Sequence, residues 1–336
     1  MKLRILSNNN IELMETLISA NQFRTKKIMS KFLKKLYPKV LETEEYIIAE
    51  GDIPIGLVAH MDTVFELEIL KGERELFYDT RKNVMYSPGG AGFDDKAGVF
   101  AIIQILRSGL RPHIILTTDE EVGAKGAVAL AKLEKPFKDL RYLIQLDRRG
   151  SNDCVFYECD NEDFVGYVEK FGFVWNYGSF SDISELCPAW KVAGVNLSIG
   201  YRDEHTESEV LFVGQMLSTI DKVKTMLKEK EIPYFEYIPS KYYSYLKNFT
   251  FDYAYEGLLQ CNSCGKHFME EEMYPVVKQD ETTVFYCIDC LVEKVGWCRE
   301  CGNAYELYSP EAPKEGLCPI CQKENFNGDK TNTKNI

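Results

Sequence analysis

Five short motifs contain the residue types that hydrolytic enzymes use to bind two metal ions and activate a water molecule. In chain order they are Ala59-His60-Met61-Asp62, Gly92-Phe93-Asp94-Asp95-Lys96-Ala97-Gly98, Thr118-Asp119-Glu120-Glu121-Val122-Gly123, Gln145-Leu146-Asp147 and Asp203-Glu204-His205. Two metal ions about 3.5–4 Å apart can share a water, lower its pKa and stabilise both oxygens of a displacement reaction. No single motif is specific, and the ordered set is what predicts hydrolytic chemistry.

Glu120 and Glu121 are adjacent carboxylates at the predicted end of a strand, where they repel each other unless positive charge lies between them. We predict that Glu121 binds a metal ion and that Glu120 is the general base that takes a proton from the water. An acidic loop is the alternative for this pair considered alone. Asp94 follows the glycine-rich turn 87–92 and could bridge two cations. A helix N-cap formed by Asp94 and Asp95 is the alternative, and both roles can hold.

His60, Asp147 and His205 supply the remaining predicted ligands for this pair of ions. Asp62, two residues after His60, is placed to orient the imidazole ring. The chain has four His in all. We interpret His113, which lies within an apolar run, as structural.

The elements that must position these residues alternate between strands and helices up to about residue 230. The apolar patterns predict strands at 45–49, 55–60, 113–118, 141–146, 154–158 and 194–199, and helices at 11–19, 22–37, 95–108, 123–133, 161–170 and 207–228. This alternation predicts an α/β fold with a mixed, mostly parallel sheet flanked by helices. Ligands of open α/β sheets bind beyond the carboxyl ends of the strands, where His60, Glu121 and Asp147 are expected.

The composition is that of an ordinary globular chain and disfavours two classes of partner. The 336 residues are 45% hydrophobic and 27% charged, and the net charge is -12. So acidic a chain is not expected to bind nucleic acid or an anionic membrane surface. We also predict no signal peptide and no transmembrane segment, because no stretch approaches about 20 apolar residues.

Eight of the eleven Cys form four C-x-x-C pairs near the C-terminus. They are Cys261 and Cys264, Cys287 and Cys290, Cys298 and Cys301, and Cys318 and Cys321. Intervals of 22 and 16 residues separate the first two and the last two pairs. This spacing predicts two structural zinc sites of four thiolates each, and a reducing cytoplasm as the location. We favour consecutive pairs as two zinc ribbons, and alternating pairs in a cross-braced module are the alternative.

We therefore predict four segments: a catalytic domain at 1–230, an aromatic-rich connector at 231–258, a double C-x-x-C module at 259–324 and a disordered tail at 325–336. The connector is too aromatic for a flexible linker, so we expect it to pack on a domain; a peptide-binding surface is the alternative. For the cysteine module we expect a protein partner, or a role as a cover over the active site. Its acidic segment 270–272 weakens a nucleic-acid role.

The five motifs resemble those of the co-catalytic di-zinc exopeptidases, a superfamily that includes tripeptidase T, the aminoacylases, the glutamate carboxypeptidases and the bacterial leucyl aminopeptidases. The resemblance covers roughly residues 50–215, and the wording of the second and third motifs is closest to tripeptidase T. It implies zinc ligands at His60, Asp94, Glu121, Asp147 and His205, with Asp94 as the bridge. It also implies Glu120 as the base, Asp62 as the orienting residue and a cis Asp94–Asp95 peptide bond.

The chain departs from tripeptidase T in one respect, because only 57 residues separate Asp147 from His205 and leave no room for a separate lid domain. Without a lid the substrate class stays open. We expect a di-zinc aminopeptidase or tripeptidase, with an N-acyl-amino-acid deacylase or carboxypeptidase as the alternative. Arg148, Arg149 and Arg202 could bind a carboxylate or the oxyanion, or pair with acids of the site. Zinc is the expected metal, with cobalt and manganese as alternatives. Two alternatives belong to other classes of protein: a non-enzymatic zinc-ribbon adaptor and a zinc-ribbon nucleic-acid protein.

Overall fold

The computed structural model describes residues 5–66, 69, 72, 74–240, 258–263, 267–269, 273–277, 283–287, 290–291, 295–297 and 304–306. The chain divides into two compact units, Met1–Asn248 and Phe249–Ile336. Five of the predicted zinc ligands lie outside the described residues: Cys264, Cys298, Cys301, Cys318 and Cys321. The predicted disordered tail at 325–336 and most of the aromatic connector also lie outside them. Within the described part of the chain, no helix is long and apolar enough to cross a membrane.

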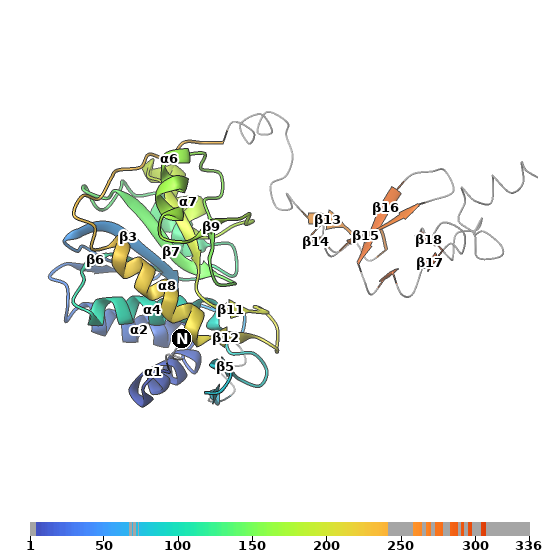
Figure 1. Ribbon diagram of the computed structural model, residues 1–336, viewed down its shortest axis with the longest axis horizontal. Helices are drawn as coiled ribbons and strands as arrows, with labels where there is room; N and C mark the ends of the chain where they lie inside the picture. Colours follow the sequence, from blue (N-terminus) through green and yellow to red (C-terminus); the bar gives the residue numbers. More distant parts are fainter. Residues whose placement is uncertain are drawn as a thin grey trace, which may run out of the picture. The chain divides into compact units, whose positions relative to one another are not determined.

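An eight-stranded mixed sheet forms the centre of the first unit (Figure 1). Its strands lie in the order β1 (Val40–Glu42), β2 (Tyr46–Ala49), β6 (Pro112–Thr117), β3 (Ile53–His60), β7 (Tyr142–Arg148), β10 (Gly194–Ser198), β8 (Asp153–Val155) and β9 (Val174–Trp175). The four central strands β6, β3, β7 and β10 are parallel neighbours. The pairs β1–β2, β2–β6 and β10–β8 are antiparallel. The predicted fold class is confirmed.

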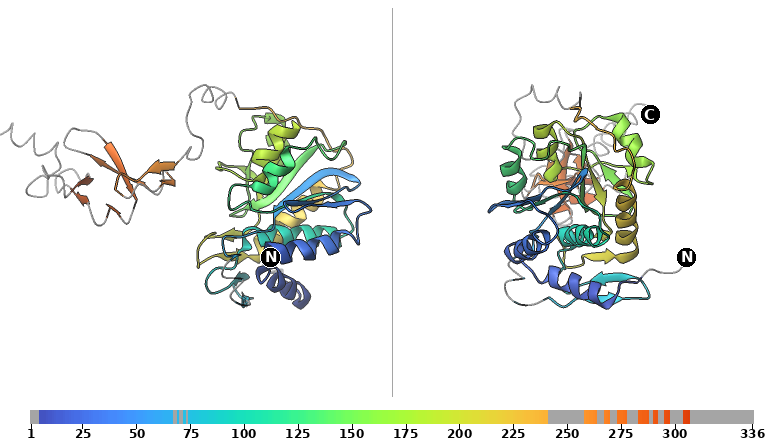
Figure 2. Two further views of the ribbon diagram at one scale, coloured as in Figure 1. Left: turned by 180° about the vertical axis from the view of Figure 1, so that it is seen from behind. Right: turned by 90° about the vertical axis from the view of Figure 1, so that its left-hand side faces the viewer.

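Helices cover both faces of this sheet (Figure 2). On one face α2 (Gln22–Leu33) and α8 (Val213–Met226) lie with α4 (Phe93–Arg107), and α1 (Asn8–Ile18) packs on α4. On the opposite face pack α5 (Lys125–Ala131) and α7 (Asp182–Trp190). Another helix, α6 (Glu162–Glu169), packs near β9. The central helix α4 is buried along most of its length because its residues are apolar on nearly all sides. It ends before Gly109, whose φ of 92° is the left-handed conformation that glycine favours after a helix.

The central strands are continuous apolar runs, as expected for strands covered on both faces. All six residues of β6 are buried, including His113, and so are the last six residues of β3. Pro112 is the first residue of β6, a position where a missing N–H is tolerated. These runs hold the carboxyl ends of β3, β6 and β7 side by side, and the motif residues lie at those ends.

A second, four-stranded sheet lies in the same unit, in the order β11 (Tyr201–Arg202), β12 (Val210–Phe212), β5 (Val84–Tyr86) and β4 (Phe77–Asp79). This sheet corrects the predicted helix at 207–228. Residues 210–212 pair with β5, with Leu211 opposite Met85, and the helix begins at Val213. Leu211 and Met85 are fully buried, so tertiary packing favours extended backbone there over the helical pattern that continues from 213.

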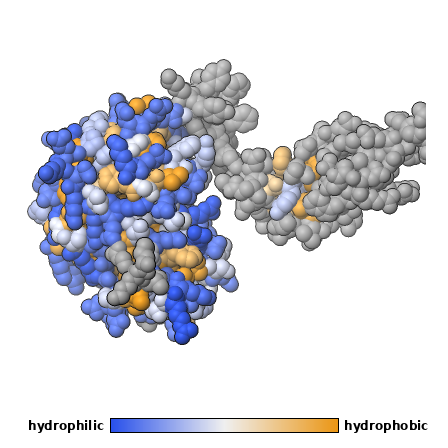
Figure 3. Space-filling model, viewed as in Figure 1, coloured by the Kyte–Doolittle hydropathy of each residue, from blue (hydrophilic) through white to orange (hydrophobic). Residues whose placement is uncertain are grey.

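The described part of the connector, 231–240, packs on the first unit. Phe235 is buried, its N–H donates to the carbonyl of Arg141, and its carbonyl accepts from the N–H of Ala193. Its ring packs against the rings of Tyr142 and Phe164. Elsewhere the face of this unit seen in Figure 3 is mostly hydrophilic, with smaller hydrophobic areas between.

The second unit contains three two-stranded antiparallel sheets among its described residues. They are β13 (Leu258–Gln260) with β14 (His267–Met269), β15 (Met273–Val277) with β16 (Thr283–Cys287), and β17 (Val295–Trp297) with β18 (Ala304–Glu306). A small cluster of buried residues lies at β15 and β16, formed by Cys261, Met273, Val276, Tyr286, Cys287 and Leu291. Two of these are Cys, so the described core of this unit includes predicted zinc ligands.

Candidate metal centre

The five candidate ligands of the first unit come together at the carboxyl ends of the central strands. His60 is the last residue of β3, and Asp147 is the sixth of the seven residues of β7. Glu121 lies in the loop after β6, and His205 lies in the turn between β11 and β12. Asp94 lies at the start of α4, between the others. The peptide bond between Asp94 and Asp95 is cis.

The two carboxylate oxygens of Asp94 face two different groups of residues. Its Oδ1 lies 3.1 Å from Nε2 of His60, and that nitrogen lies 3.5 Å from Oδ1 of Asp147. Its Oδ2 lies 3.2 Å from Nε2 of His205, and that nitrogen lies 3.0 Å from Oε2 of Glu121. The donor atoms of each group all lie within 4.8 Å of one another. Asp94 is therefore shared by two three-residue clusters.

The chemistry and spacing of both clusters fit divalent cations. Tetrahedral zinc with bonds of about 2.0–2.1 Å sets neighbouring ligand atoms about 3.3 Å apart, close to the distances between these donors. Each cluster combines one imidazole with carboxylates, a common zinc donor set. Oε1 of Glu121 is buried without a hydrogen-bond partner in the described part of the chain, which leaves it able to bind an ion.

The crowding of carboxylates alters their pKa values in a way that cations would relieve. Burial, together with the charges of Asp147, Asp182 and Asp94, raises the pKa of Glu120 to about 9. Burial and the charge of Asp94 raise the pKa of Asp147 to about 7. Its acceptors Asp94 and Glu121 raise the pKa of His205 to about 11, because they stabilise a positive charge at this position. A bound cation would supply that charge in place of the proton.

Polar side chains from several elements fix Asp147. The hydroxyl of Ser181 donates to its Oδ2 at 2.9 Å, and Nε2 of Gln145 donates to the same oxygen at 3.1 Å. The hydroxyl of Tyr201 donates to Oδ1 at 3.1 Å. The backbone N–H of Asp147 donates to the side chain of Asn196 at 3.0 Å. Such supporting bonds hold a ligand in one orientation and contribute to metal affinity.

Asp62 and Asp95 contact the residues and the helix that form the candidate metal centre. Oδ1 of Asp62 lies 3.3 Å from Nδ1 of His60, the position predicted for an orienting carboxylate. Its Oδ2 accepts a bond from the N–H of Glu121 at 3.1 Å and so joins the two motifs. Asp95 accepts a bond from the N–H of Gly98 at 2.9 Å, which is the bond of a helix N-cap. Asp94 and Asp95 have non-helical φ and ψ inside α4, so Asp95 caps the regular helix that follows it, and Asp94 faces the cluster.

The three arginines near the motifs pair with groups other than the candidate ligands. Arg149 Nη1 lies 3.1 Å from Oε1 of Glu204, and Arg148 Nη2 lies 3.7 Å from Oδ2 of Asp153. The guanidinium of Arg202 lies over the ring of Phe212. Their recorded contacts therefore give no direct support to a carboxylate-binding role.

Several residues that contact the site escaped the sequence analysis. This group includes Ser181, Tyr201, Asn196 and Glu209, all of them buried. Glu209 accepts bonds from three backbone N–H groups of the loop that carries Asp94. The sequence around Glu209 carries no signal for this role, because an isolated Glu in an acidic, polar stretch cannot be distinguished from a surface residue.

Comparison with protein families identifies the chain. The model of peptidase family M20/M25/M40 matches residues 56–256, which include all five candidate ligands and Glu120. The chain belongs to this peptidase family. No curated protein matches it.

Solved structures of other peptidases share the fold of this family member. A tripeptidase from Staphylococcus aureus has a TM-score of 0.53 at 14% identity, over 67% of this chain and 99% of its own. A TET aminopeptidase from a marine sediment Thaumarchaeota archaeon has a TM-score of 0.52 at 16% identity, over 67% and 98%. An aminopeptidase from the archaeon Desulfurococcus kamchatkensis has a TM-score of 0.51 at 16% identity, over 66% and 94%.

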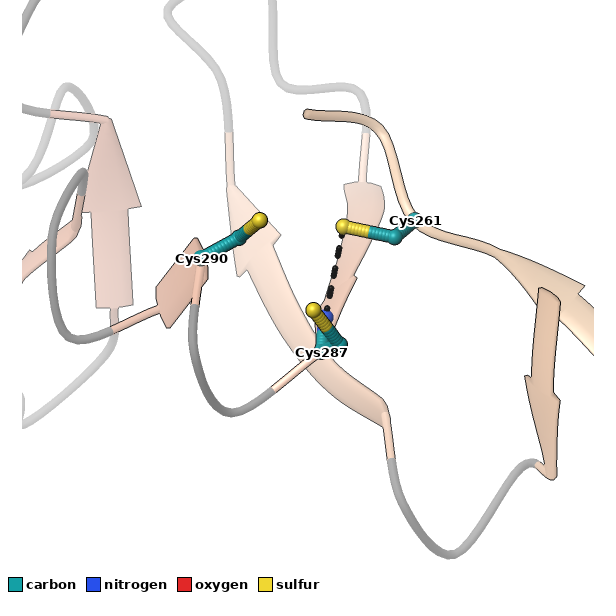
Figure 4. Close-up of side chains that lie close together, drawn as sticks. All are labelled: Cys261, Cys287 and Cys290. Carbon is teal, nitrogen blue, oxygen red and sulfur yellow. Dashed lines mark hydrogen bonds between the residues drawn. The ribbon is translucent and has the colours of Figure 1, made fainter. Parts of the chain in front are cut away.

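The cysteine cluster of the second unit lies outside the residues that match the peptidase family. Sulfur atoms of Cys261, Cys287 and Cys290 lie within 4.8 Å of one another (Figure 4). The N–H of Cys287 donates to Sγ of Cys261 at 3.4 Å. Consecutive C-x-x-C pairs would group these three residues, whereas alternating pairs would separate Cys261 from the other two. The geometry therefore agrees with the consecutive arrangement for the described Cys.

Proposed function

We propose that this peptidase is a two-metal exopeptidase that releases the N-terminal residue of short peptides, as an aminopeptidase or tripeptidase. The observation that carries the proposal is the shared position of Asp94, whose two oxygens face separate His-carboxylate clusters. Under this proposal His60 and Asp147 bind one ion, Glu121 and His205 bind the other, and Asp94 bridges them. Zinc is the first choice of metal, and cobalt and manganese are alternatives because such carboxylate-rich sites accept several divalent ions.

The chain's own residues carry out the proton transfers. The metal ions would lower the pKa of a water and stabilise negative charge on the scissile carbonyl oxygen. Glu120 accepts the proton of the attacking water and delivers it to the leaving amine. Its pKa of about 9 reflects burial and nearby carboxylates, so cations among those carboxylates would lower the pKa toward the range of a general base. Asp62 orients His60.

Two observations favour free peptides over N-acylated substrates. The structural relatives named above are a tripeptidase and aminopeptidases. Arg148 and Arg149, which could bind a substrate carboxylate, are engaged by Asp153 and Glu204.

The segment from β8 to β11 between Asp147 and His205 belongs to the sheets of the first unit, so no inserted domain lies in this described stretch. The side chain of His205 is half exposed, and under this proposal a short peptide reaches the ions from that side.

The decisive experiment measures amino-acid release from free and N-acylated di- and tripeptides by the zinc-loaded protein and by its Glu120→Gln variant. We expect cleavage of free peptides only. The variant should keep its metal ions and lose about 10²–10⁴-fold in kcat, the usual contribution of a general base. Preference for acylated substrates would transfer the protein to the deacylases or carboxypeptidases. Full activity in Glu120→Gln would overturn the base assignment, and no release from any substrate would favour the adaptor reading.

For the second unit we propose two structural zinc ions bound by consecutive C-x-x-C quartets, and a protein as the partner of this module. The triad of Cys261, Cys287 and Cys290 supports the first quartet. This proposal includes the domain boundaries predicted from the sequence, with catalysis at 1–230 and the zinc module at 259–324. It also includes a cytoplasmic location.

A further inference from the structure

Glu209 is a buried carboxylate that links two loops of the metal centre. Its side chain is 1% exposed, and it lies between the turn of His205 and the first residue of β12. Oε2 accepts bonds from the N–H groups of Ala91 at 3.1 Å and Gly92 at 2.5 Å, and Oε1 accepts a bond from the N–H of Asp94 at 3.0 Å. The carboxylate is thus bound by the backbone of the loop that carries the bridging candidate Asp94.

The glycines of this loop allow the N–H groups to converge on one anion. Gly90 and Gly92 have φ values of 81° and 70°. A Cβ at Gly90 would lie 2.2 Å from the ring of Phe65, and a Cβ at Gly92 would lie 2.7 Å from Oγ1 of Thr63. Successive N–H groups in such a conformation form an anion-binding concavity. Glu209 occupies it, and this explains why the turn before Asp94 is rich in glycine.

His205, in contrast, depends on an exposed turn for its position. Its side chain is 50% exposed, and both His205 and Asp203 have positive φ, at 63° and 57°. The turn is stabilised locally: the hydroxyl of Thr206 donates to the carbonyl of Asp203 at 2.7 Å, and the N–H of Glu209 donates to the carbonyl of Thr206 at 3.2 Å. Within the described part of the chain, His205 and Glu209 are the residues of 203–209 that bond to the Asp94 loop.

The buried carboxylate of Glu209 is easier to explain if cations bind nearby. A buried carboxylate is costly unless it is well bonded, and here it also lies beside the anionic Asp94. Cations bound by Asp94 would offset the repulsion between the two carboxylates.

We infer that Glu209 is a positioning residue that fixes the His205 turn against the Asp94 loop and thereby sets the affinity of the ion site formed by Asp94, Glu121 and His205. The inference rests on the proposed two-metal function. Glu209 is not one of the candidate ligands, and its effect passes through the position of the His205 turn relative to the Asp94 loop.

The test compares metal binding by the full-length chain and three variants: Glu209→Gln, His205→Ala and, as the matched control, the exposed neighbour Glu207→Gln. In Glu209→Gln an amide N–H would oppose a backbone N–H, while side-chain size is preserved. Zinc titration by calorimetry and metal analysis after dialysis give the affinity of each ion. All four proteins carry the same Cys, so differences in metal content report the carboxylate site.

We expect Glu209→Gln to weaken one carboxylate-site ion by about 10–100-fold, the usual cost of losing a supporting residue, and to leave the other ion bound. It should therefore resemble His205→Ala in metal content, and Glu207→Gln should resemble the wild type. Equal weakening of both ions, or unchanged affinities in Glu209→Gln, would overturn the positioning role while the two-metal function stands. A wild type that binds fewer than two ions at the carboxylate site would overturn the proposed function and this inference together.

Discussion

Neighbouring residues with the same side chain can have different tasks, and their surroundings decide which. Asp94 faces His60 and His205, whose bonds lower its pKa against the effect of burial. Asp95 faces the interior, where burial and nearby carboxylates raise its pKa, and it bonds to the N–H groups of Gly98 and His60. A motif with two Asp therefore supplies one metal-ligand candidate and one helix cap.

At the same scale, His113 should be neutral in the folded protein at a pH where an ordinary histidine is half charged. It is buried and stacked on Phe137, with ring centroids 4.2 Å apart, and its Nδ1 accepts a bond from the N–H of Gly51 at 3.1 Å. Burial lowers its pKa from 6.5 although Asp139 opposes the shift. Because the folded-state pKa is the lower one, the unfolded state binds more protons between the two values. The stability from His113 is therefore complete above pH 6.5 and is lost as the pH falls through its folded-state pKa.

An NMR titration of the His113 ring in the folded chain measures this directly, and we expect a pKa below 6.5. The Asp139→Asn variant provides the control. It removes the acceptor that lies 3.0 Å from Nε2, so the pKa should fall further. A value at or above that of an unburied histidine, or a rise in Asp139→Asn, would contradict the structural role assigned to His113.

At the scale of elements, the contact between α4 and β7 depends on a helical glycine. A Cβ at Gly98 would lie 2.3 Å from Oδ1 of Asp95 and 2.4 Å from the carbonyl oxygen of Leu146. Gly98→Ala should therefore lower the free energy of unfolding by about 1–3 kcal/mol through overpacking. It should also weaken metal binding, because Asp95 and Leu146 are adjacent in the chain to Asp94 and Asp147.

The same substitution in another helix supplies the control. Gly166 is exposed in α6, and an added Cβ there meets nothing within 4 Å. Gly166→Ala should raise stability by up to about 1 kcal/mol, because alanine is the better helix former. Denaturant titrations of both variants, followed by circular dichroism, check the pair. Similar effects of the two changes would show that helix propensity alone decides and that the close approach of α4 to β7 does not matter.

The elements that the sequence predicts well are those whose patterns are local. The apolar runs at 55–60 and 113–118 correspond to β3 and β6, because strands covered on both faces need apolar residues throughout. The four-stranded sheet escaped prediction, since its strands are two or three residues long and pair residues such as Tyr86 and Val210 that are far apart in the chain. Such short segments carry no readable period.

The candidate site shows the same difference between residues that local sequence patterns reveal and residues that only long-range contacts reveal. His60, Asp94, Glu121, Asp147 and His205 stand in motifs that the sequence displays, and the structure brings their side chains together. Residues that hold them, such as Ser181, Tyr201 and Glu209, come from separate segments of the chain and are recognisable only once the fold has placed them. Their roles depend on long-range geometry, which one sequence does not contain.

At the scale of the whole molecule, the two units contain different kinds of core. The first unit has a large apolar core formed by both sheets and their helices. The buried cluster described in the second unit is small and includes Cys261 and Cys287. Small modules with so few buried apolar residues usually need metal ions or disulfides for stability. The second unit should therefore depend on the zinc ions proposed for it for folding, and the first unit should need the ions proposed for its carboxylate site for catalysis.

This difference predicts opposite responses to two single substitutions in the full-length chain. Cys261→Ser removes a thiolate from the cluster with Cys287 and Cys290, so the second unit should lose one zinc ion and much of its folded structure, because zinc binding supplies folding energy to such modules. Peptide hydrolysis should stay unchanged, since its residues belong to a separately compact unit. His205→Ala should do the reverse: it should abolish hydrolysis and leave the second unit folded. Metal analysis, limited proteolysis and peptidase assays of both variants measure the three effects. Loss of hydrolysis in Cys261→Ser would show that the metal ions of the second unit are required for catalysis, and that the two units do not act independently.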